Sequence, residues 1–234
     1  MKKKVYLVLK IVFLLLIIAS LFGLFSWYND KKVSEKIQEE SKNLLEEVKT
    51  EEGIQYTVKK EATKKNEDTI GWLKVNGTKI DYPVVQTKDN NYYLKHNYLK
   101  QKSSAGWIFM DYRNSINDQN IAIYGHHRKD GIMFGDIDKL MKKKFYDNND
   151  GKILLVINNE NIYYQIFSVY RAKSNDDYAN SNYDNFEEKL KEFKSKSMVK
   201  FDSNLDDVKQ IITLSTCHDN NKDRLVVHAY RILS

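Results

Sequence analysis

The chain opens with its most apolar stretch. Residues 5–28 carry no charged side chain except Lys10. Residues 11–28 alone would form roughly 27 Å of helix at 1.5 Å per residue, close to the ~30 Å thickness of a bilayer's hydrocarbon core. Trp27 and Tyr28 stand where an interfacial aromatic belt would lie. The pattern predicts an N-terminal transmembrane helix.

Lysines set the expected orientation of that helix. Lys2, Lys3, Lys4 and Lys10 precede the apolar stretch with no acid among them. By the positive-inside rule, the N-terminus would stay in the cytoplasm and the rest of the chain would lie outside. A cleaved signal peptide is the competing interpretation, but the small residues near the end of the stretch form no Ala-x-Ala cleavage site.

Residues 29–52 are highly charged, and their apolar positions recur near helical spacing. Lysines also precede glutamates by four residues at several places. The apolar positions are Val33, Ile37, Leu44, Leu45 and Val48. This pattern predicts an amphipathic helix or stalk over residues 29–52.

From residue 69 onward the pattern changes to short runs rich in Ile, Val, Tyr and Trp, separated by turn residues. Each run is typical of a β-strand. The eight predicted strands cover residues 69–75, 79–86, 105–111, 120–127, 152–157, 162–172, 210–217 and 224–233. Eight strands in about 165 residues predict a β-barrel.

Two predicted helices interrupt these strands, over residues 133–146 and 185–196. Asp184 and Glu187 have capping-box spacing at the start of the second helix. Residues 53–234 are numerous enough to form one domain with its own core. The expected fold class is therefore mainly β with peripheral helices.

Charge and motif content narrow the functional classes. The net charge is +6 and the isoelectric point about 9.0, but most lysines outside the N-terminal tip are interleaved with acids. The chain has no Gly-rich phosphate loop and no Cys/His spacing that would hold a metal. We therefore expect no nucleic-acid partner, no metal and no cofactor. The surface would suit an anionic cell wall.

The only cysteine, Cys217, ends the apolar and β-branched run 211–217. A single cysteine is often just a small buried hydrophobe. Outside the cytoplasm, however, this one has no second cysteine with which to form a disulfide. The next strand begins with Arg224 after a six-residue polar loop, so antiparallel pairing would place Arg224 beside Cys217. A neighbouring cation lowers a thiol's pKa, which favours Cys217 as a nucleophile.

A thiol nucleophile needs a proton shuttle. Three of the five histidines have contexts typical of surface or core residues: His96, His218 and His228. His126 and His127 end the run 120–127 just as Cys217 ends its own run. Adjacent residues of a strand face opposite ways, so only one of the two can meet Cys217. The periodicity does not say which.

These residues carry a resemblance to the sortase family. The motif Leu-Ser-Thr-Cys at 214–217 followed by Arg224, the motif Tyr-Gly-His at 124–126 and the N-terminal anchor are similar to those of a sortase. The segment 124–136, together with the helix between the sixth and seventh strands, resembles the class B branch. The resemblance covers about residues 53–234 and implies an eight-stranded sortase-type β-barrel.

The resemblance also implies roles. Cys217 matches the nucleophile, His126 the proton-transferring histidine, and Arg224 the arginine that orients the peptide and stabilises the oxyanion. Three further residues match substrate-binding positions: Ser215, Asn90 and Leu94. The implied enzyme is a cysteine transpeptidase of Gram-positive bacteria. It cleaves a C-terminal sorting signal of surface proteins through a thioester and transfers them to an amine of a peptidoglycan precursor.

The expected organisation has three parts: residues 1–28 as cytoplasmic tip and signal anchor, 29–52 as stalk, and 53–234 as catalytic barrel. Two alternatives stay open. An extracytoplasmic thiol peptidase without transfer would use the same residues and differ only in its products. A non-catalytic barrel that binds wall polymer would have no reactive thiol.

Overall fold

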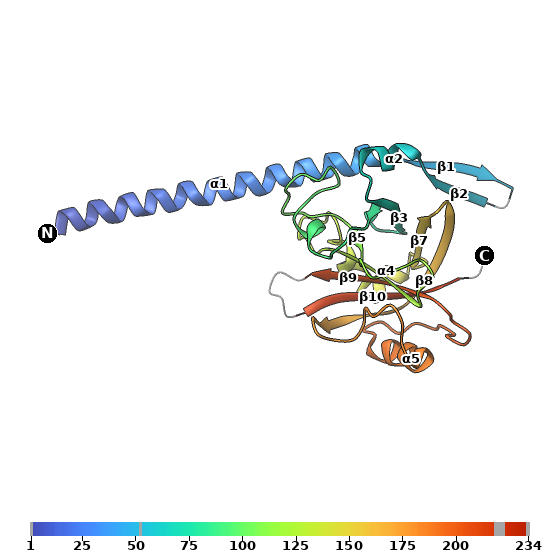
Figure 1. Ribbon diagram of the computed structural model, residues 1–234. Coiled ribbons are helices and arrows are strands. Elements are labelled where there is room, and N and C mark those ends of the chain that lie inside the picture. The colour runs from blue at the N-terminus through green and yellow to red at the C-terminus, as the bar shows by residue number, and fades with distance from the viewer. Residues whose placement is uncertain (1, 52, 218–222, 233–234) are drawn as a thin grey trace.

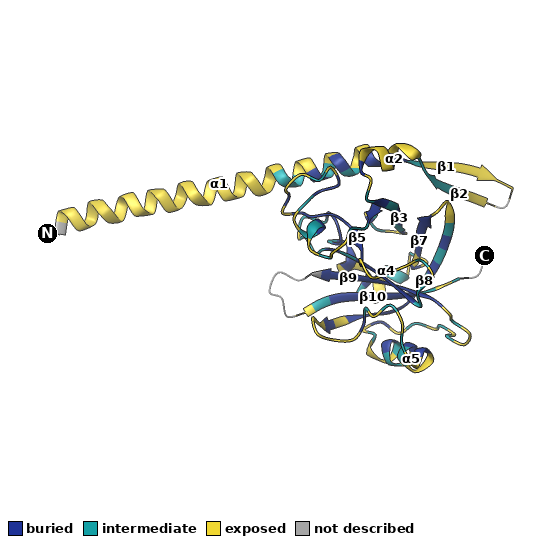
Figure 2. Ribbon diagram, viewed as in Figure 1, coloured by how far each residue is buried: buried dark blue, intermediate teal, exposed yellow. Residues whose placement is uncertain are grey.

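A long N-terminal helix stands out from the body of the molecule (Figure 1). The computed structural model describes residues 2–51, 53–217 and 223–232, and helix α1 spans Lys2–Lys42. Its large apolar residues from Val5 to Tyr28 are exposed (Figure 2). Within the described part of the chain, α1 is the one helix long and apolar enough to cross a membrane, and its apolar window is 0% buried in the protein. The predicted apolar helix is therefore present and is no core helix.

The second half of α1 packs against the barrel. Its buried residues include Ser34, Ile37 and Ser41. Gln38 donates from Nε2 to the carbonyl of Lys79 at 3.0 Å. The apolar helix thus continues without a break into a segment fastened to the domain.

The prediction of a helix over residues 29–52 is wrong beyond Lys42. There the chain turns, and β1 (Leu45–Thr50) pairs antiparallel with β2 (Gly53–Val58). The spacing of Leu44, Leu45 and Val48 fits a helix. The segment that follows, residues 53–58, is rich in β-branched and aromatic residues, which favour strands. Pairing with that later segment decides the conformation.

Eight strands close into a barrel, as predicted. They are β3 (Thr69–Val75), β4 (Asp81–Val85), β5 (Phe109–Met110), β6 (Asn120–His126), β7 (Lys152–Ile157), β8 (Glu160–Lys173), β9 (Ile211–Cys217) and β10 (Asp223–Arg231). The order around the barrel is β10-β8-β7-β3-β4-β5-β6-β9. Neighbours pair antiparallel except β4 with β5 and β6 with β9, which are parallel. The parallel pair β6 and β9 brings two strand C-termini to the same rim.

The predicted strand over residues 105–111 shortens to β5. Gly106 has a left-handed φ of 59°, and the Trp107 N–H donates to the Tyr93 carbonyl at 2.8 Å instead of to a strand neighbour. Tyr93 belongs to the short 3-10 helix η1 (Tyr92–Leu94). The segment before β5 therefore lies against this helix as a loop.

The helix predicted over residues 133–146 is two short helices, α3 (Ile137–Leu140) and α4 (Lys143–Tyr146). Met133 has a left-handed φ of 52°, and the Phe134 N–H donates to the His126 carbonyl at 3.1 Å. The first residues of the predicted helix instead fold back on the end of β6.

The second predicted helix is present as α5 (Phe186–Lys196). Its cap is Asn185, whose Oδ1 accepts from the Glu188 N–H at 3.2 Å, while its Nδ2 donates to the Glu188 carboxylate at 2.9 Å. The capping pair therefore lies one residue later than Asp184 and Glu187. A further short helix, α2 (Lys60–Lys65), precedes β3.

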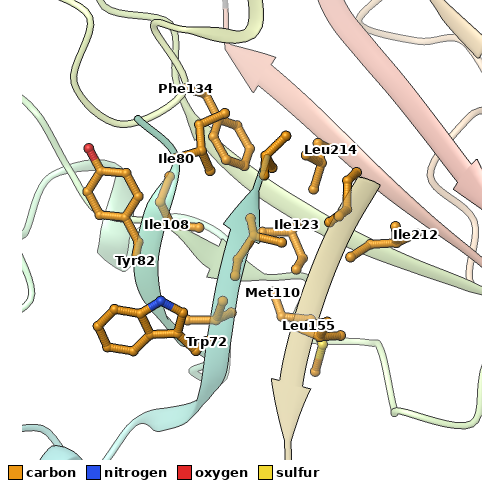
Figure 3. Packing of buried hydrophobic residues seen from close by; sticks show 14 of the residues in the cluster. Trp72, Ile80, Tyr82, Ile108, Met110, Ile123, Phe134, Leu155, Ile212 and Leu214 are labelled. Atoms are coloured by element: carbon orange, nitrogen blue, oxygen red, sulfur yellow. The ribbon is translucent and has the colours of Figure 1, made fainter. Parts of the chain in front are cut away.

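Strand β9 is buried on both faces. Ile212 and Leu214 join the barrel core (Figure 3). Ile211 belongs to a second cluster, which includes Phe186, Leu190 and Phe193 of α5. A strand sandwiched in this way has little freedom to shift. Its last residues, which approach the rim, are thereby held in place.

Candidate functional site

The ends of β6 and β9 meet at one rim of the barrel. In their parallel register Tyr124 lies opposite Ser215, and His126 opposite Cys217. The strongest nucleophile candidate and one of the two candidate histidines are thus last residues of adjacent strands. Strand ends, where loops converge, are common places for binding and catalytic groups.

A cavity of about 280 Å³ lies beside this rim. Its lining includes Asn90, Leu94, Tyr124, Tyr178, Ser215 and Arg224. The three residues that the resemblance assigns to substrate binding therefore line the same hollow as the arginine. Thr216, which directly precedes Cys217, lines it too.

His126 is half-buried, and its ring makes one hydrogen bond to the residues that the structure describes. Its Nε2 lies 2.8 Å from the Leu94 carbonyl oxygen. A carbonyl can only accept, so Nε2 carries the proton in this contact. The neutral ring then has Nδ1 as the nitrogen able to take up a proton.

His127 has a different environment. Its Nε2 lies 2.6 Å from the Asp138 carboxylate of α3, and its backbone forms a β-bridge with Met133. The cross-strand partner of Cys217 is His126. The register thus separates two histidines that strand periodicity left equivalent.

Arg224 is the second residue of β10. The antiparallel register between β9 and β10 pairs Ser215 with Val226, and counting two residues onward along each strand reaches Cys217 and Arg224. Over residues 2–51, 53–217 and 223–232, the Nη1 of Arg224 is buried and has no hydrogen-bond partner. Leaving a buried charged donor without a partner is costly, so this atom is poised to bind an acceptor.

Cys217 is described by its backbone, as the last residue of β9. The predicted contact of its thiol with Arg224 lies outside the described part of the structure. So does His218, together with residues 219–222 of the predicted polar loop.

Two of the predicted substrate-binding side chains already have partners. Ser215 is buried, and its hydroxyl lies 3.1 Å from the Tyr178 hydroxyl. Asn90 accepts a hydrogen bond at Oδ1 from the Tyr112 N–H at 3.0 Å. These contacts hold the polar groups in fixed positions along the cavity.

Tyr124 is a cavity residue that the sequence reasoning missed. Its hydroxyl donates to Asp111 at 3.0 Å, and Arg113 makes a two-pronged contact with the same carboxylate at 2.9 and 2.7 Å. Burial alone would raise the pKa of Asp111, but the hydrogen bonds from Arg113 outweigh it and hold the pKa below its ordinary value. Strand alternation places Tyr124 on the same face as His126 and is a signal that could have found it. Tyr178 comes from a loop and has no such signal.

The remaining described histidines fit structural roles. His96 stacks on Tyr92 with ring centroids 4.1 Å apart, and its Nδ1 lies 2.8 Å from the Tyr92 carbonyl. His228 is fully buried, and burial lowers its pKa to about 3, with a smaller contribution from Lys196. Among the residues that the structure describes, no cluster of three or more His, Cys, Asp or Glu could hold a metal ion.

The sequence matches the Sortase domain family over residues 73–232. Sortase B of Listeria monocytogenes is 38% identical over an alignment of 178 residues, which covers 70% of this chain and 70% of the relative. Sortase B of Staphylococcus aureus is 36% identical over 160 residues, covering 66% of this chain and 65% of the relative.

Solved structures are similar over most of the chain. Sortase B from Bacillus anthracis in complex with AAEK1 superposes with a TM-score of 0.76 at 32% identity, covering 88% of this chain and 100% of that one. A Staphylococcus aureus sortase B–substrate complex has a TM-score of 0.68 at 34% identity, and the match covers 74% of this chain and 83% of that one.

Proposed function

The chain belongs to the sortase family and to its class B branch, and from this premise we propose a membrane-anchored transpeptidase that attaches surface proteins to the cell wall. The enzyme cleaves the C-terminal sorting signal of a surface protein and passes the protein to an amine of a peptidoglycan precursor. The observation that carries the proposal is the convergence of the ends of β6 and β9 with Arg224 beside one cavity.

The first step forms a thioester. The Cys217 thiolate attacks the carbonyl carbon of the scissile peptide bond, and the C–N bond breaks as the tetrahedral intermediate collapses. His126, protonated at Nδ1, gives that proton to the leaving amine, because its Nε2–H is committed to Leu94. The signal tail departs with a free amino group.

The second step reverses the proton flow. An amine of the acceptor attacks the thioester carbonyl, and neutral His126 takes the amine's proton at Nδ1. The C–S bond breaks, a new amide forms, and Cys217 leaves as thiolate. The enzyme returns with a protonated His126 and a thiolate, ready for another cycle.

Arg224 is the proposed oxyanion and peptide ligand. Both tetrahedral intermediates carry a negative oxygen, and the buried Nη1 lacks a partner among the described residues. A charged donor already held in place stabilises such an oxygen without reorganisation at the moment of reaction. Beside the cavity, the planar guanidinium can also bind a peptide carbonyl through a second N–H.

The cavity is the proposed peptide site. Leu94 both lines the cavity and supplies the carbonyl that orients His126, so peptide binding and histidine orientation share one residue. Ser215 and Asn90 add polar groups along the same wall. The signal peptide would therefore lie between η1 and the end of β9, with its scissile carbonyl at Cys217.

Helix α1 is the proposed membrane anchor, with the N-terminus cytoplasmic and the barrel extracytoplasmic. The lysine-rich tip and the exposed apolar side chains support this orientation. A membrane-impermeant thiol reagent tests it, since Cys217 is the only cysteine. Labelling in right-side-out vesicles without permeabilisation is expected. Labelling only after permeabilisation would reverse the topology.

The reaction itself is tested on the full chain in detergent. Candidate sorting-signal peptides are incubated with the enzyme, with and without a panel of amines, and the products and the protein are weighed by mass spectrometry. We expect an acyl adduct on the wild-type protein and an amine-linked product when amine is present. Hydrolysed peptide alone, at every amine concentration, would identify a thiol peptidase without transfer.

A further inference from the structure

We propose that Asp30, on the part of α1 that leaves the apolar segment, is a positioning residue for His126. The membrane anchor thereby forms part of the support of the active site and does more than tether it. This inference rests on the proposed role of His126 in proton transfer.

Asp30 binds a loop of the barrel through both carboxylate oxygens. Oδ1 accepts from the Ser103 hydroxyl at 2.8 Å, and Oδ2 accepts from the Ser104 hydroxyl at 2.5 Å and from the Ala105 N–H at 3.1 Å. Only 18% of the Asp30 side chain is exposed. Three donors on consecutive residues thus converge on one carboxylate, which fixes the loop to the helix.

The same carboxylate faces the chain just after His126. Arg128 Nη1 lies 3.7 Å from Asp30 Oδ2 and donates to the Ser104 hydroxyl at 3.4 Å. On its other side, Arg128 is paired with the nearly buried Asp130 at 2.6 Å. Asp30 therefore joins two segments, the loop at 103–105 and the extension of β6.

These two segments enclose the imidazole of His126. The loop continues into Gly106, where a Cβ would lie 2.9 Å from His126 Cδ2 and 2.5 Å from the Tyr93 carbonyl oxygen. The backbone at Gly106 therefore lies directly against the ring, beside the Leu94 carbonyl that accepts from Nε2. A shift of this loop would move the surface that holds the ring in its orientation.

A second cavity shows that the helix reaches the same place from outside. This hollow of about 450 Å³ is lined by Trp27 of α1 and by Ser104, His126 and Arg128, among others. Trp27 lies one helical turn before Asp30. The helix, the loop and His126 thus share one surface.

Asp30 is not needed merely to keep α1 attached. The helix also buries Ile37 and Ser41 and donates from Gln38 to the Lys79 carbonyl. Loss of the carboxylate should therefore leave the helix docked and loosen mainly the loop at 103–105. The consequence is misplacement of His126, and a misplacement of about 1 Å can cost on the order of 10²-fold in rate.

The test compares full-length variants in detergent. For Asp30→Ala we expect the kcat of transpeptidation to fall about 10- to 100-fold, with a smaller change in KM. Asp30→Asn keeps one acceptor oxygen, so its kcat should fall less than that of Asp30→Ala. Glu35→Gln is the matched control, because the ion pairs of Glu35 on the same helix join it, within the described residues, to the partly exposed Lys31 and the exposed Lys32.

A spectroscopic readout separates positioning from general destabilisation. The ring ¹⁵N shifts of His126, recorded at a pH high enough to neutralise the ring and assigned with a His126→Ala sample, report how much of the neutral ring carries its proton on Nε2. We expect predominantly Nε2–H in the wild type and in Glu35→Gln, and a mixture of tautomers in Asp30→Ala. If Asp30→Ala melts below the assay temperature, the Ser103→Ala/Ser104→Ala double variant removes the same contacts from the loop side.

Wild-type kcat and tautomer in a folded Asp30→Ala or in the double serine variant would overturn the proposal. An active wild-type enzyme in the same experiment would leave the proposed function standing. Conversely, a wild-type chain that forms no acyl-enzyme would remove the proposed function, whatever the state of His126.

Discussion

Strands β6, β9 and β10 carry polar side chains both in the middle of the barrel and at its rim, and the two regions differ in how fully these side chains are hydrogen-bonded. In the middle, the Thr213 hydroxyl donates to Asn120 at 2.6 Å and lies 2.8 Å from Nδ1 of His228. With its one proton used on Asn120, Thr213 must accept from Nδ1–H, so Nε2 accepts from the Tyr170 hydroxyl at 3.1 Å. His228 also stacks on Phe193 with centroids 3.9 Å apart.

At the rim, a few residues along the same strands, His126 and Arg224 are not saturated in this way by the residues that the structure describes. His126 uses one ring nitrogen, on Leu94. Arg224 Nη1 is buried without a partner among the described residues. His126 on β6 and His228 on β10, the two strands that flank β9, therefore differ in which ring nitrogens are hydrogen-bonded. A saturated polar group stabilises one structure, whereas an unsaturated one is available to a substrate.

The largest effect should come from Cys217. Cys217→Ala removes the nucleophile, so both the acyl adduct and the cleaved peptide are expected to disappear completely, while the thermal melting temperature stays near that of the wild type. Mass spectrometry of protein and peptide measures both. Undiminished cleavage by this variant would show that the protein is not a cysteine enzyme. The rim would then hold no more reactive a group than the strand middle.

The next effect should separate His126 from its neighbour. His126→Ala should lose about 10²–10⁴-fold in kcat/KM, the range that acid–base catalysis supplies. His127→Ala is the matched control and should lose far less, since His127 contacts Asp138 of α3. The two variants exchanging these behaviours would mean that the register of β6 is shifted by one residue.

Removal of the unsatisfied donor should cost somewhat less. Arg224→Ala and Arg224→Lys should both lose on the order of 10²–10³-fold in acyl-enzyme formation, as for loss of an oxyanion donor. Lysine should not rescue, because it lacks the planar fork of N–H groups. Stopped-flow or quenched acylation measures the rate, with melting curves to show that the variants are folded. Near-normal acylation by a folded Arg224→Ala would reduce this arginine to a surface cation.

The smallest effect on activity should come from the saturated region, where pH acts on stability instead. The pKa of His228 falls from its ordinary 6.5 to about 3 on folding, so the unfolded chain binds more protons between these values. The contribution of His228 to the free energy of unfolding should therefore be full above pH 6.5. It should be lost as pH falls toward 3, by up to about 1.4 kcal/mol per pH unit. Denaturant unfolding from pH 7 to pH 4 measures this loss.

A substitution isolates the contribution of His228. His228→Phe keeps a ring against Phe193 but leaves the Tyr170 hydroxyl short of a partner, so stability at pH 7 should fall by about 1–3 kcal/mol. Its stability should then depend less steeply on pH. Equal slopes for wild type and His228→Phe would show that this histidine does not titrate on unfolding.

The sequence by itself determined the features that depend on local spacing. Alternating and β-branched runs marked all eight barrel strands, and an uncharged run marked the apolar helix. The chemistry-bearing residues Cys217, His126 and Arg224 stand in short motifs at strand ends. These signals are local because side-chain periodicity is set by the backbone geometry of a single element.

Only the tertiary structure decided the features that depend on distant partners. Residues 45–50 satisfy helical and strand patterns alike, and pairing with β2 made them a strand. The resemblance favoured His126 over His127, but its place opposite Cys217 comes from the parallel register of β6 on β9. Tyr178 lines the cavity from a loop, and Asp30 of α1 contacts the loop at 103–105. In each case the deciding contact joins segments far apart in the chain, and periodicity within one segment carries no information about such a contact.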